Sequence, residues 1–293
     1  MTDLIYAKQI FLNIYPDKLL ADQIIEYITN NNNKISKLIK LCKKGKKSRV
    51  CKQNAFDKLC LAFAYLPLTK AKYSELGIED EIFYDTMSDI KIWIDDYKQF
   101  NNNEYGLGEL NWIFLHLHCL IFKLGRLQFQ LSNYFISPWY NKNGISIKLG
   151  DKCLNLHIPR GEKLDIGACQ QSFAKAKEFF PKFFPSYPTN IFECYSWIFY
   201  NGNANYMTPQ SNLIKFSNMF EISSHCEHPS EALKYIFGIN KSNKELIKNK
   251  RKYGYYYDLS AVKPLTSLQK QAKEYIMNGG KLGHAKGQII LNN

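Results

Sequence analysis

The sequence lacks several features that would assign it to a class of protein. No apolar run approaches the ~18 residues that a helix needs to span a bilayer, and the start MTDLIYAKQIF lacks the basic-then-apolar order of a signal peptide. The eight cysteines form no CxxC pair, and the cluster from His225 to His228 has no second metal-competent pair elsewhere. We therefore expect a cytoplasmic protein with reduced cysteines, no membrane span and no metal site.

Acidic residues are also scarce: 26 Asp and Glu stand against 39 Lys and Arg, which gives a formal net charge of +13. Such a balance suits a polyanionic partner. Much of the excess lies in residues 34–52 (KISKLIKLCKKGKKSRVCK), the basic segment, which contains none of the aromatic residues that single-strand binding sites interleave with basic ones. We expect a solvated loop between two helices there. A basic nucleic-acid-binding protein is the alternative.

Hydrophobic residues make up 45% of the chain, which is enough for a substantial core. In the first part they recur at helical spacing, so we predict helices there. Pro67 should stop the second helix, Thr86 or Ser88 should cap the third, and Gly125 should end the fourth. The predicted helices cover residues 19–28, 56–65, 86–100 and 110–124.

After Gly125, polar and apolar residues begin to alternate, as they do in half-buried strands. Pro181 and Pro185 should close the first helix of this part. Strands are predicted at residues 126–131, 145–149, 154–158, 191–199 and 288–291, and helices at residues 166–180, 211–220 and 267–277. The chain is therefore predicted to join a helical domain (residues 1–125) to an α/β domain (residues 126–293) that shares an interface with it.

The stretch LNLHIPRGEKLDIGACQQSFAKAKEFF, residues 154–180, is predicted to form a strand, a sharp turn and a helix. A helix start exposes unpaired backbone N–H groups and partial positive charge, which suit a pyrophosphate. Asp165 is placed to cap this helix. The predicted phosphate-binding residues are Ile158, Arg160, Gly161, Lys163, Ile166, Gly167 and Ala168. A plain strand–helix connection is the alternative.

The order strand, turn, helix, strand, helix resembles the core of the GNAT acyltransferases. The segments TMSDIKIWI, LNWIFLHLHCLIFKLGRLQFQL, LNLHIPRGEKLD, FECYSWIF, SNLIKFSNMF and LTSLQKQAKEYIMNGGKLGHAKGQI resemble, in this order, a family of bacterial two-domain acyltransferases. These proteins join a helical N-terminal acyltransferase domain to a GNAT-like C-terminal domain. The resemblance runs from about residue 80 to the end and leaves the basic segment outside it.

The resemblance implies an α+β fold, with a helical N-terminal domain packed on a GNAT-like mixed-sheet domain, and N-acyl transfer. The donor would be acyl-CoA or an acyl carrier protein, with acyl-CoA lying between two splayed strands, and the acceptor a peptide side chain or a small-molecule amine. Asn212 lies where many GNATs hold the pantetheine arm with an asparagine; capping of its helix is the alternative. The turn has one glycine where GNAT loops have a second small residue, and residues 212–220 lack the usual tyrosine acid.

Amine attack on a thioester needs a deprotonated amine, a donor for the developing oxyanion and an acid for the leaving thiolate. In the predicted strand LNLHI, Asn155 and His157 share one face. Because a free imidazole titrates near pH ~6.5, His157 is our candidate general base. A core histidine bonded to a neighbouring backbone group is an equal alternative.

On the next predicted strand, Cys194 and Ser196 share the face opposite Glu193 and Tyr195. If the face of Cys194 and Ser196 meets the donor, either side chain would protonate the thiolate or bond the pantetheine. If the opposite face meets the donor, Glu193 and Tyr195 are the candidates. The alternative for Cys194 is a buried, inert thiol. For the whole chain, a further alternative is a catalytically silent protein that binds acyl-CoA for regulation.

Overall fold

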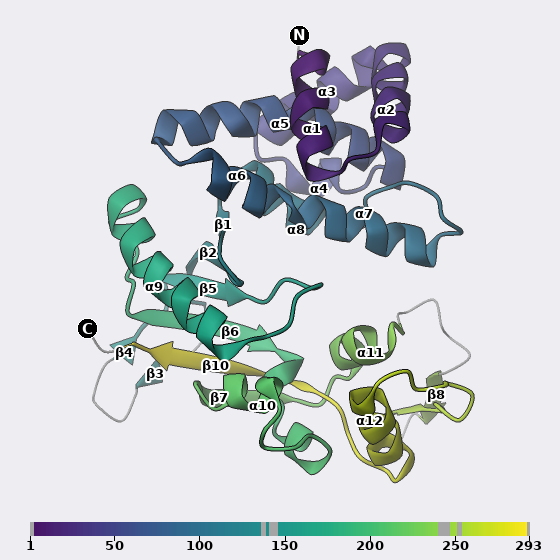
Figure 1. Ribbon diagram of the computed structural model, residues 1–293, viewed down its shortest axis with the longest axis vertical. Coiled ribbons are helices and arrows are strands. Elements are labelled where there is room, and N and C mark those ends of the chain that lie inside the picture. Colours follow the sequence, from purple (N-terminus) through teal and green to yellow (C-terminus); the bar gives the residue numbers. More distant parts are fainter. Residues whose placement is uncertain (1–2, 136–138, 141–145, 240–246, 251–253, 292–293) are drawn as a thin grey trace. The chain divides into compact units, whose positions relative to one another are not determined.

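The chain forms two compact units, and each is described by itself (Figure 1). The computed structural model describes residues 3–135, 139–140, 146–239, 247–250 and 254–291. Unit 1 comprises Met1–Leu131, Ile158–Lys163 and Gln171–Pro185, and unit 2 comprises Ser132–His157, Leu164–Gln170 and Ser186–Asn293. The domain boundary between residues 125 and 126 stays a prediction.

Unit 1 is mainly helical, and its first helices begin at side-chain caps. Asp3 accepts the backbone N–H groups of Ile5 and Tyr6, each at 3.0 Å, and Asp17 accepts that of Leu20 at 2.9 Å. The helices are α1 (Leu4–Ile14), α2 (Lys18–Asn30), α3 (Asn32–Lys43), α4 (Lys47–Val50), α5 (Ala55–Leu76), α6 (Asp80–Met87), α7 (Asp89–Phe100) and α8 (Leu110–Leu117). The hairpin strand β1 (Ile121–Leu124), most of β2 (Leu127–Asn133) and most of α9 (Ile166–Phe183) complete the unit.

Helix α5 continues through Pro67, so the prediction that this proline stops the helix is wrong. A proline inside a helix removes a backbone hydrogen bond and costs about 3 kcal/mol or more. Burial on both sides of the proline offsets this cost, because Leu66 and Tyr73 are fully buried. Pro181 likewise lies inside α9, which ends at Phe183, three residues later than predicted.

The helix predicted at residues 110–124 is also wrong in its second half. α8 ends at Leu117, and residues 121–124 form the strand β1. The chain changes direction at Cys119, whose φ is +55°, and Gly125, with φ +81°, makes the tight turn that pairs Leu124 with Leu127. A short apolar run fits a buried strand as well as a buried helix. This ambiguity explains the error.

The basic segment is helical over much of its length, contrary to the predicted solvated loop. α3 and α4 occupy it, and Ile35, Leu38 and Cys42 of α3 are buried. Its first lysine, Lys34, lies 2.5 Å from the buried carboxylate of Asp57. The lysines therefore belong to an amphipathic helix that packs in unit 1.

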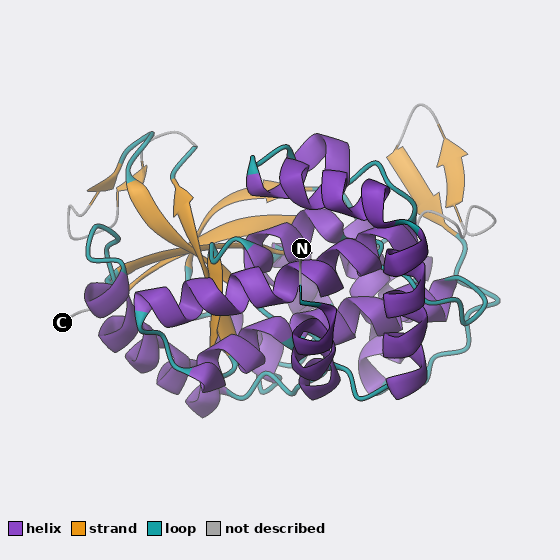
Figure 2. Cartoon of the chain, turned by 90° about the horizontal axis from the view of Figure 1, so that it is seen from above, coloured by secondary structure: helices purple, strands orange, loops and turns teal. Residues whose placement is uncertain are grey.

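Unit 2 is organised around a mixed sheet, as predicted. Strands β5 (Lys152–His157), β6 (Ile191–Ser196), β10 (His284–Ile290) and β7 (Glu221–Cys226) are neighbours in the order β5-β6-β10-β7. β5 and β6 are parallel, and β10 runs antiparallel to both β6 and β7. Figure 1 shows β10, in yellow, between β6 and β7, and Figure 2 shows the twist of the strands.

Shorter elements complete the description of unit 2. They are β3 (Trp139–Tyr140), β4 (Ser146–Ile147), η1 (Trp197–Phe199), η2 (Asn201–Asn205), α10 (Asn212–Ser217), α11 (Ser230–Phe237), β8 (Ile247–Lys250), β9 (Gly254–Tyr257) and α12 (Ser267–Met277). The strand predicted at residues 191–199 ends at Ser196, because η1 follows, and the last strand begins at His284 instead of residue 288. The strand predicted at residues 145–149 is reduced to β4, and residue 145 lies outside the described residues.

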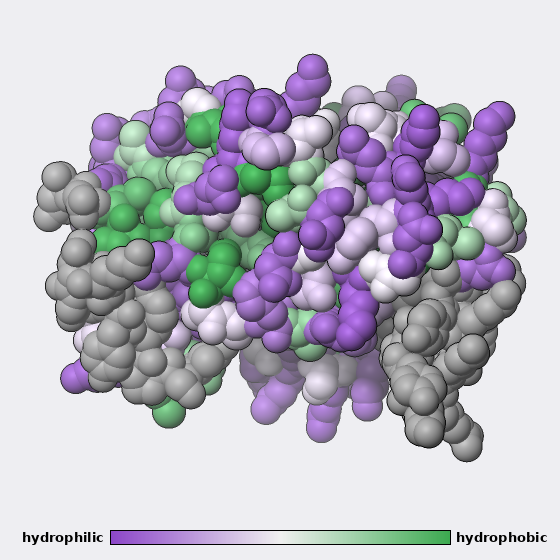
Figure 3. All heavy atoms as spheres, turned by 90° about the horizontal axis from the view of Figure 1, so that it is seen from below, coloured by the Kyte–Doolittle hydropathy of each residue, from purple (hydrophilic) through white to green (hydrophobic). Residues whose placement is uncertain are grey.

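None of the described helices combines the length and the hydrophobicity that crossing a bilayer requires. On the face drawn in Figure 3, hydrophilic and hydrophobic residues both reach the surface. Large exposed hydrophobic side chains include Leu19 in unit 1 and Leu265 in unit 2.

Candidate functional site

Strands β5 and β6 lie side by side and share a short parallel register. Their parallel register comprises Leu154 opposite Phe192 and Asn155 opposite Glu193, whereas β6 pairs with β10 along its whole length. Beyond Asn155 and Glu193, both strands run on towards their carboxyl ends outside this register. The parts of the two strands beyond this register, towards their carboxyl ends, are the place at which we expect the donor. We call this feature the β5–β6 fork.

The register decides which predicted catalytic side chains share a face. Because Asn155 lies opposite Glu193 and side chains alternate along a strand, His157 is on the face of Glu193 and Tyr195. Cys194 and Ser196 lie on the opposite face of β6. The four predicted catalytic residues His157, Glu193, Cys194 and Ser196 therefore do not form one cluster, and their roles stay predictions.

Glu193 is held by a lysine that the sequence analysis missed. The Nζ atom of Lys286, on β10, lies 2.5 Å from Oε2 of Glu193 and 3.9 Å from the centre of the Tyr134 ring. Lys286 is 4% exposed, and Glu193 is nearly as buried. This ion pair joins β10 to β6 at the last residue pair of the β5–β6 register. Lys286 was missed because the last strand was predicted to begin only at residue 288.

Cys194 and Ser196 both have local explanations. Burial raises the pKa of the Cys194 thiol well above its ordinary value, so the thiol is protonated and a poor nucleophile. Ser196 accepts the backbone N–H of Ile198 at 3.2 Å and thereby starts η1. The burial of Cys194 favours a structural, unreactive thiol over a nucleophile.

Further titratable side chains gather at the carboxyl end of β6. The ring of His284, at the start of β10, lies 4.4 Å from that of Tyr195 and 6.0 Å from that of His228. Burial lowers the pKa of His284, so its imidazole is neutral at neutral pH. Among the described residues, no group of three or more metal-ligating side chains forms a metal site. The neutral imidazole of His284 is instead suited to accepting a proton.

Glu231, in the first turn of α11, is a second titratable group at this edge. It accepts a hydrogen bond from the Trp197 backbone N–H, which begins η1, and burial raises its pKa to about 7. The sequence analysis missed Glu231, because nothing in the pattern of α11 indicates that its first turn reaches the end of β6. Its raised pKa means that the folded chain holds a proton that the unfolded chain releases.

Glu231→Gln should therefore remove a pH dependence of stability. The folded-state pKa lies above the unfolded value of about 4.5, so the stabilisation is complete below pH ~4.5 and is lost as the pH rises towards 7. One such proton gives a slope of at most ~1.4 kcal/mol per pH unit. Urea unfolding between pH 5 and 7 measures the slope. Glu274→Gln, at an exposed position, should keep the wild-type slope; an unchanged slope in Glu231→Gln would contradict the assignment.

The first part of the predicted phosphate turn, residues 158–163, lies in unit 1. A side chain from outside the turn holds its backbone. Arg126 donates to the carbonyl oxygens of Lys163 at 2.8 Å and Glu162 at 2.9 Å. Lys123 lies 2.8 Å from the carboxylate of Glu162. Gly161 has φ +95°, which favours glycine there. Side chains of the β1–β2 hairpin therefore fix the conformation of the turn.

Arg160, predicted to bind phosphate, forms an ion pair with Asp96. A phosphate would have to compete with this carboxylate or share the guanidinium with it. The side chain of Arg160 is about one-third exposed, so one side of it still faces solvent. The predicted binding roles of Ile158, Arg160, Gly161 and Lys163 stay predictions.

The second part of the turn, in unit 2, carries the helix start. Asp165 accepts the Ala168 backbone N–H at 2.9 Å, which confirms the predicted cap. This carboxylate uses one donor that a phosphate would need, and its charge opposes a second anion. Ile166 and Gly167 stay predictions. In α10, Ser211 makes the capping bond, to Ile214 at 3.2 Å, so Asn212 is not needed as the cap.

Removing the guanidinium of Arg126 should loosen the turn. Arg126→Met loses two charge-assisted hydrogen bonds, so we expect the free energy of unfolding to fall by ~2–4 kcal/mol. Trypsin should then cleave after Arg160 or Lys163 faster than in the unchanged protein, as timed by mass spectrometry. Lys215→Met, at an exposed position in α10, is the control. Equal cleavage rates in both variants would show that Arg126 does not hold the turn.

A buried polar network in unit 1 centres on Asp89, at the start of α7. Its carboxylate accepts the indole N–H groups of Trp93, at 3.0 Å, and of Trp112. The amide of Gln128 donates to it at 3.1 Å, and Nε2 of His116 lies 3.4 Å away. Burial lowers the pKa of His116, whereas the negative charge of Asp89 acts to raise it. This network ties α7 and α8 to β2.

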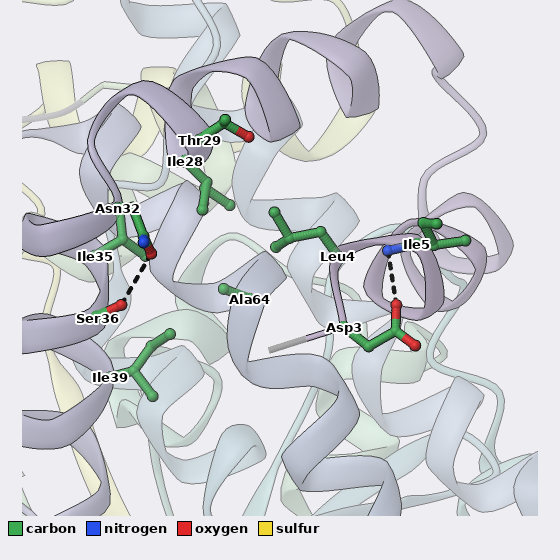
Figure 4. Close-up of a pocket in the computed structure, with 10 residues that line it drawn as sticks. All are labelled: Asp3, Leu4, Ile5, Ile28, Thr29, Asn32, Ile35, Ser36, Ile39 and Ala64. Atoms are coloured by element: carbon green, nitrogen blue, oxygen red, sulfur yellow. Dashed lines mark hydrogen bonds between the residues drawn. The ribbon is translucent and has the colours of Figure 1, made fainter. Parts of the chain in front are cut away.

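Unit 1 also contains an apolar cavity of about 320 Å³, lined by residues from α1, α2, α3 and α5 (Figure 4). Leu4, Ile28, Ile39 and Ala64 contribute apolar surface to it. Its polar side chains are engaged locally: Asp3 caps α1, and Ser36 donates to Asn32 at 3.1 Å.

Both parts of the chain match known families. Residues 31–119 match the family described as an N-acyltransferase N-terminal domain, and residues 121–289 match a GNAT-like C-terminal domain. The basic segment thus belongs to the first match, and the prediction that it lies outside the resemblance is wrong. A search of curated proteins gave no match.

The fold is similar to solved acyltransferase structures. One is an acyltransferase in complex with decanoyl-CoA and teicoplanin, with 21% identity and a TM-score of 0.65; another is an acyltransferase mutant in complex with octanoyl-CoA, with 20% identity and the same TM-score. Each similarity covers 80% of this chain and 66% of the other, so the chain spans less than two thirds of their length. At this identity, the likeness establishes the fold.

Proposed function

We propose that this chain, which belongs to the family joining an N-acyltransferase N-terminal domain to a GNAT-like C-terminal domain, transfers an acyl group from acyl-CoA to an amine. The observation that carries the proposal is the β5–β6 fork, in which the parallel register of the two strands ends at Asn155 and Glu193. The order β5-β6-β10-β7 around the fork supports the same conclusion.

The reaction needs little covalent help from the protein. The amine nitrogen attacks the thioester carbonyl, the C–S bond breaks, and the nitrogen loses a proton while the thiolate gains one. We expect backbone N–H groups along the fork to stabilise the oxyanion. We propose His157 as the base that removes the proton, since it ends β5 on the face of Glu193 and Tyr195. His284 and Tyr195 lie on the same face of the sheet, at the carboxyl end of β6.

Several finer points belong to the same proposal. The bond formed is an amide, and acyl-CoA is the donor, with an acyl carrier protein as an alternative carrier of the thioester. The acceptor is a peptide side chain or a small amine. We place the reaction in the cytoplasm, because all eight cysteines are free thiols, as in reducing compartments.

A coupled assay tests the proposal. Purified protein is incubated with decanoyl-CoA and a panel of amines, and free CoA thiol and acylated amine are both measured. Equal, amine-dependent amounts of the two products are expected. Stabilisation by decanoyl-CoA without any release of thiol would contradict transfer and indicate a silent acyl-CoA-binding protein. Neither stabilisation nor release would contradict the donor site as well.

A further inference from the structure

A polar groove of about 490 Å³ lies in unit 2, open to solvent. The chain from Tyr200 to Asn205, in and before η2, lines one side, and Tyr275 with residues 279–281, at and beyond the end of α12, lines the other. Its volume falls within the range of about 300–1,000 Å³ that is usual for ligand sites. We call it the η2–α12 groove.

Glycines fix the two tyrosine rings of the groove. A Cβ atom on Gly280 would lie 2.6 Å from the ring of Tyr275, and one on Gly202 would lie 2.6 Å from the ring of Tyr200. Such distances are too short for a real side chain, so the rings can take these places only against glycine. Tyr206 also stacks on Tyr275, with ring centres 5.1 Å apart. The rings are therefore held in position before any ligand binds.

The groove adjoins the carboxyl end of β6. A Cβ atom on Gly283 would lie 2.6 Å from the ring of Tyr200, and Gly283 directly precedes His284 at the start of β10. The Tyr200 ring also lies 6.2 Å from that of His225, near the end of β7. Tyr200 thus lines the groove and also contacts the start of β10, next to the place where Tyr195 and His284 meet.

The lining indicates what kind of ligand fits. It consists of tyrosine, asparagine, glycine and one lysine. Tyrosine supplies rigid amphipathic contact surface, and asparagine and glycine supply adaptable hydrogen bonds; this composition is typical of surfaces that recognise polypeptides. Asparagine amides both donate and accept, as the backbone of an extended peptide requires. A small free amine would fill only a fraction of the volume.

We propose that the η2–α12 groove binds the polypeptide that carries the acceptor amine. This inference rests on the proposed acyl transfer, because the groove receives its role from the reaction at the adjoining sheet edge. Asn201 is exposed at the rim, so Asn201→Trp fills the groove without disturbing buried contacts. Asn218→Trp places the same ring at an exposed position after α10 and is the matched control.

A binding experiment tests the groove without relying on turnover. Immobilised protein is exposed to synthetic nine-residue peptides that carry a central lysine and randomised flanks, and retained peptides are identified by mass spectrometry. Wild type and Asn218→Trp should retain the same subset, and Asn201→Trp at least ~10-fold less of it. Equal retention by the two tryptophan variants would overturn the inference. Displacement of the peptides by millimolar glucosamine would also overturn it and would indicate a sugar site.

A kinetic experiment then connects binding to transfer. For the retained peptides, Asn201→Trp should raise the acceptor KM at least ~10-fold, while the KM for decanoyl-CoA and the kcat with lysine amide stay within twofold. An equal loss with lysine amide would overturn the assignment. Groove-dependent retention without any acyl transfer by the wild type would overturn the proposed function and leave the peptide site standing.

Discussion

Replacing His157 with alanine is expected to lower kcat for acyl transfer by ~10²–10⁴-fold, the usual contribution of a general base. His157 is the last residue of β5 and shares a face with Glu193 and Tyr195. Without it, the attacking nitrogen has to lose its proton to water. His157→Gln should lose activity to a similar extent, because glutamine keeps hydrogen bonding and loses basicity. Steady-state rates with decanoyl-CoA and lysine amide measure the effect.

The control for this prediction is a histidine away from the fork. His118, in unit 1, stacks on Phe114 with ring centres 4.0 Å apart. His118→Ala should keep kcat within about twofold of the wild type, whatever it costs in stability. A His157→Ala protein with binding of decanoyl-CoA intact and kcat within threefold of the wild type would show that His157 is not the base.

Replacing Asp89 with alanine should cost ~3–5 kcal/mol of unfolding free energy, because it leaves buried donors without their charged acceptor. Trp93, Trp112 and Gln128 all donate to this carboxylate. Urea unfolding followed by tryptophan fluorescence measures the loss. Asp85→Ala, four residues earlier at an exposed position outside this network, should cost no more than ~0.5 kcal/mol. A loss below 1 kcal/mol for Asp89→Ala would contradict the role of the network.

The sequence was most informative where periodicity alone decides the structure. The alternation in LNLHI and the apolar spacing of residues 19–28 placed β5 and α2 correctly, because each buries one regular face. Pro67 was misleading because the buried neighbours of α5 outweigh the cost of a proline. Residues 121–124 were misleading because the positive φ of Cys119 ends α8 where no glycine or proline marks an end.

The site was predictable along one strand and not across strands. That Asn155 and His157 share a face follows from alternation, but which face of β6 they meet depends on the register with Glu193. Lys286 and Glu231 reach β6 from β10 and α11, far along the chain, so no local pattern indicates them. The partner of Arg160, Asp96, lies 64 residues earlier and is likewise a product of the fold.

Photolabelling would test most directly whether the β5–β6 fork holds the donor. An acyl-CoA analogue with a diazirine in the pantetheine arm is cross-linked to the protein, and labelled peptides are identified by mass spectrometry with and without excess decanoyl-CoA. We expect labelling that decanoyl-CoA suppresses in residues 153–158 and 193–198. Suppressible labelling confined to other parts of the chain, or no suppressible labelling at saturating analogue, would contradict the account.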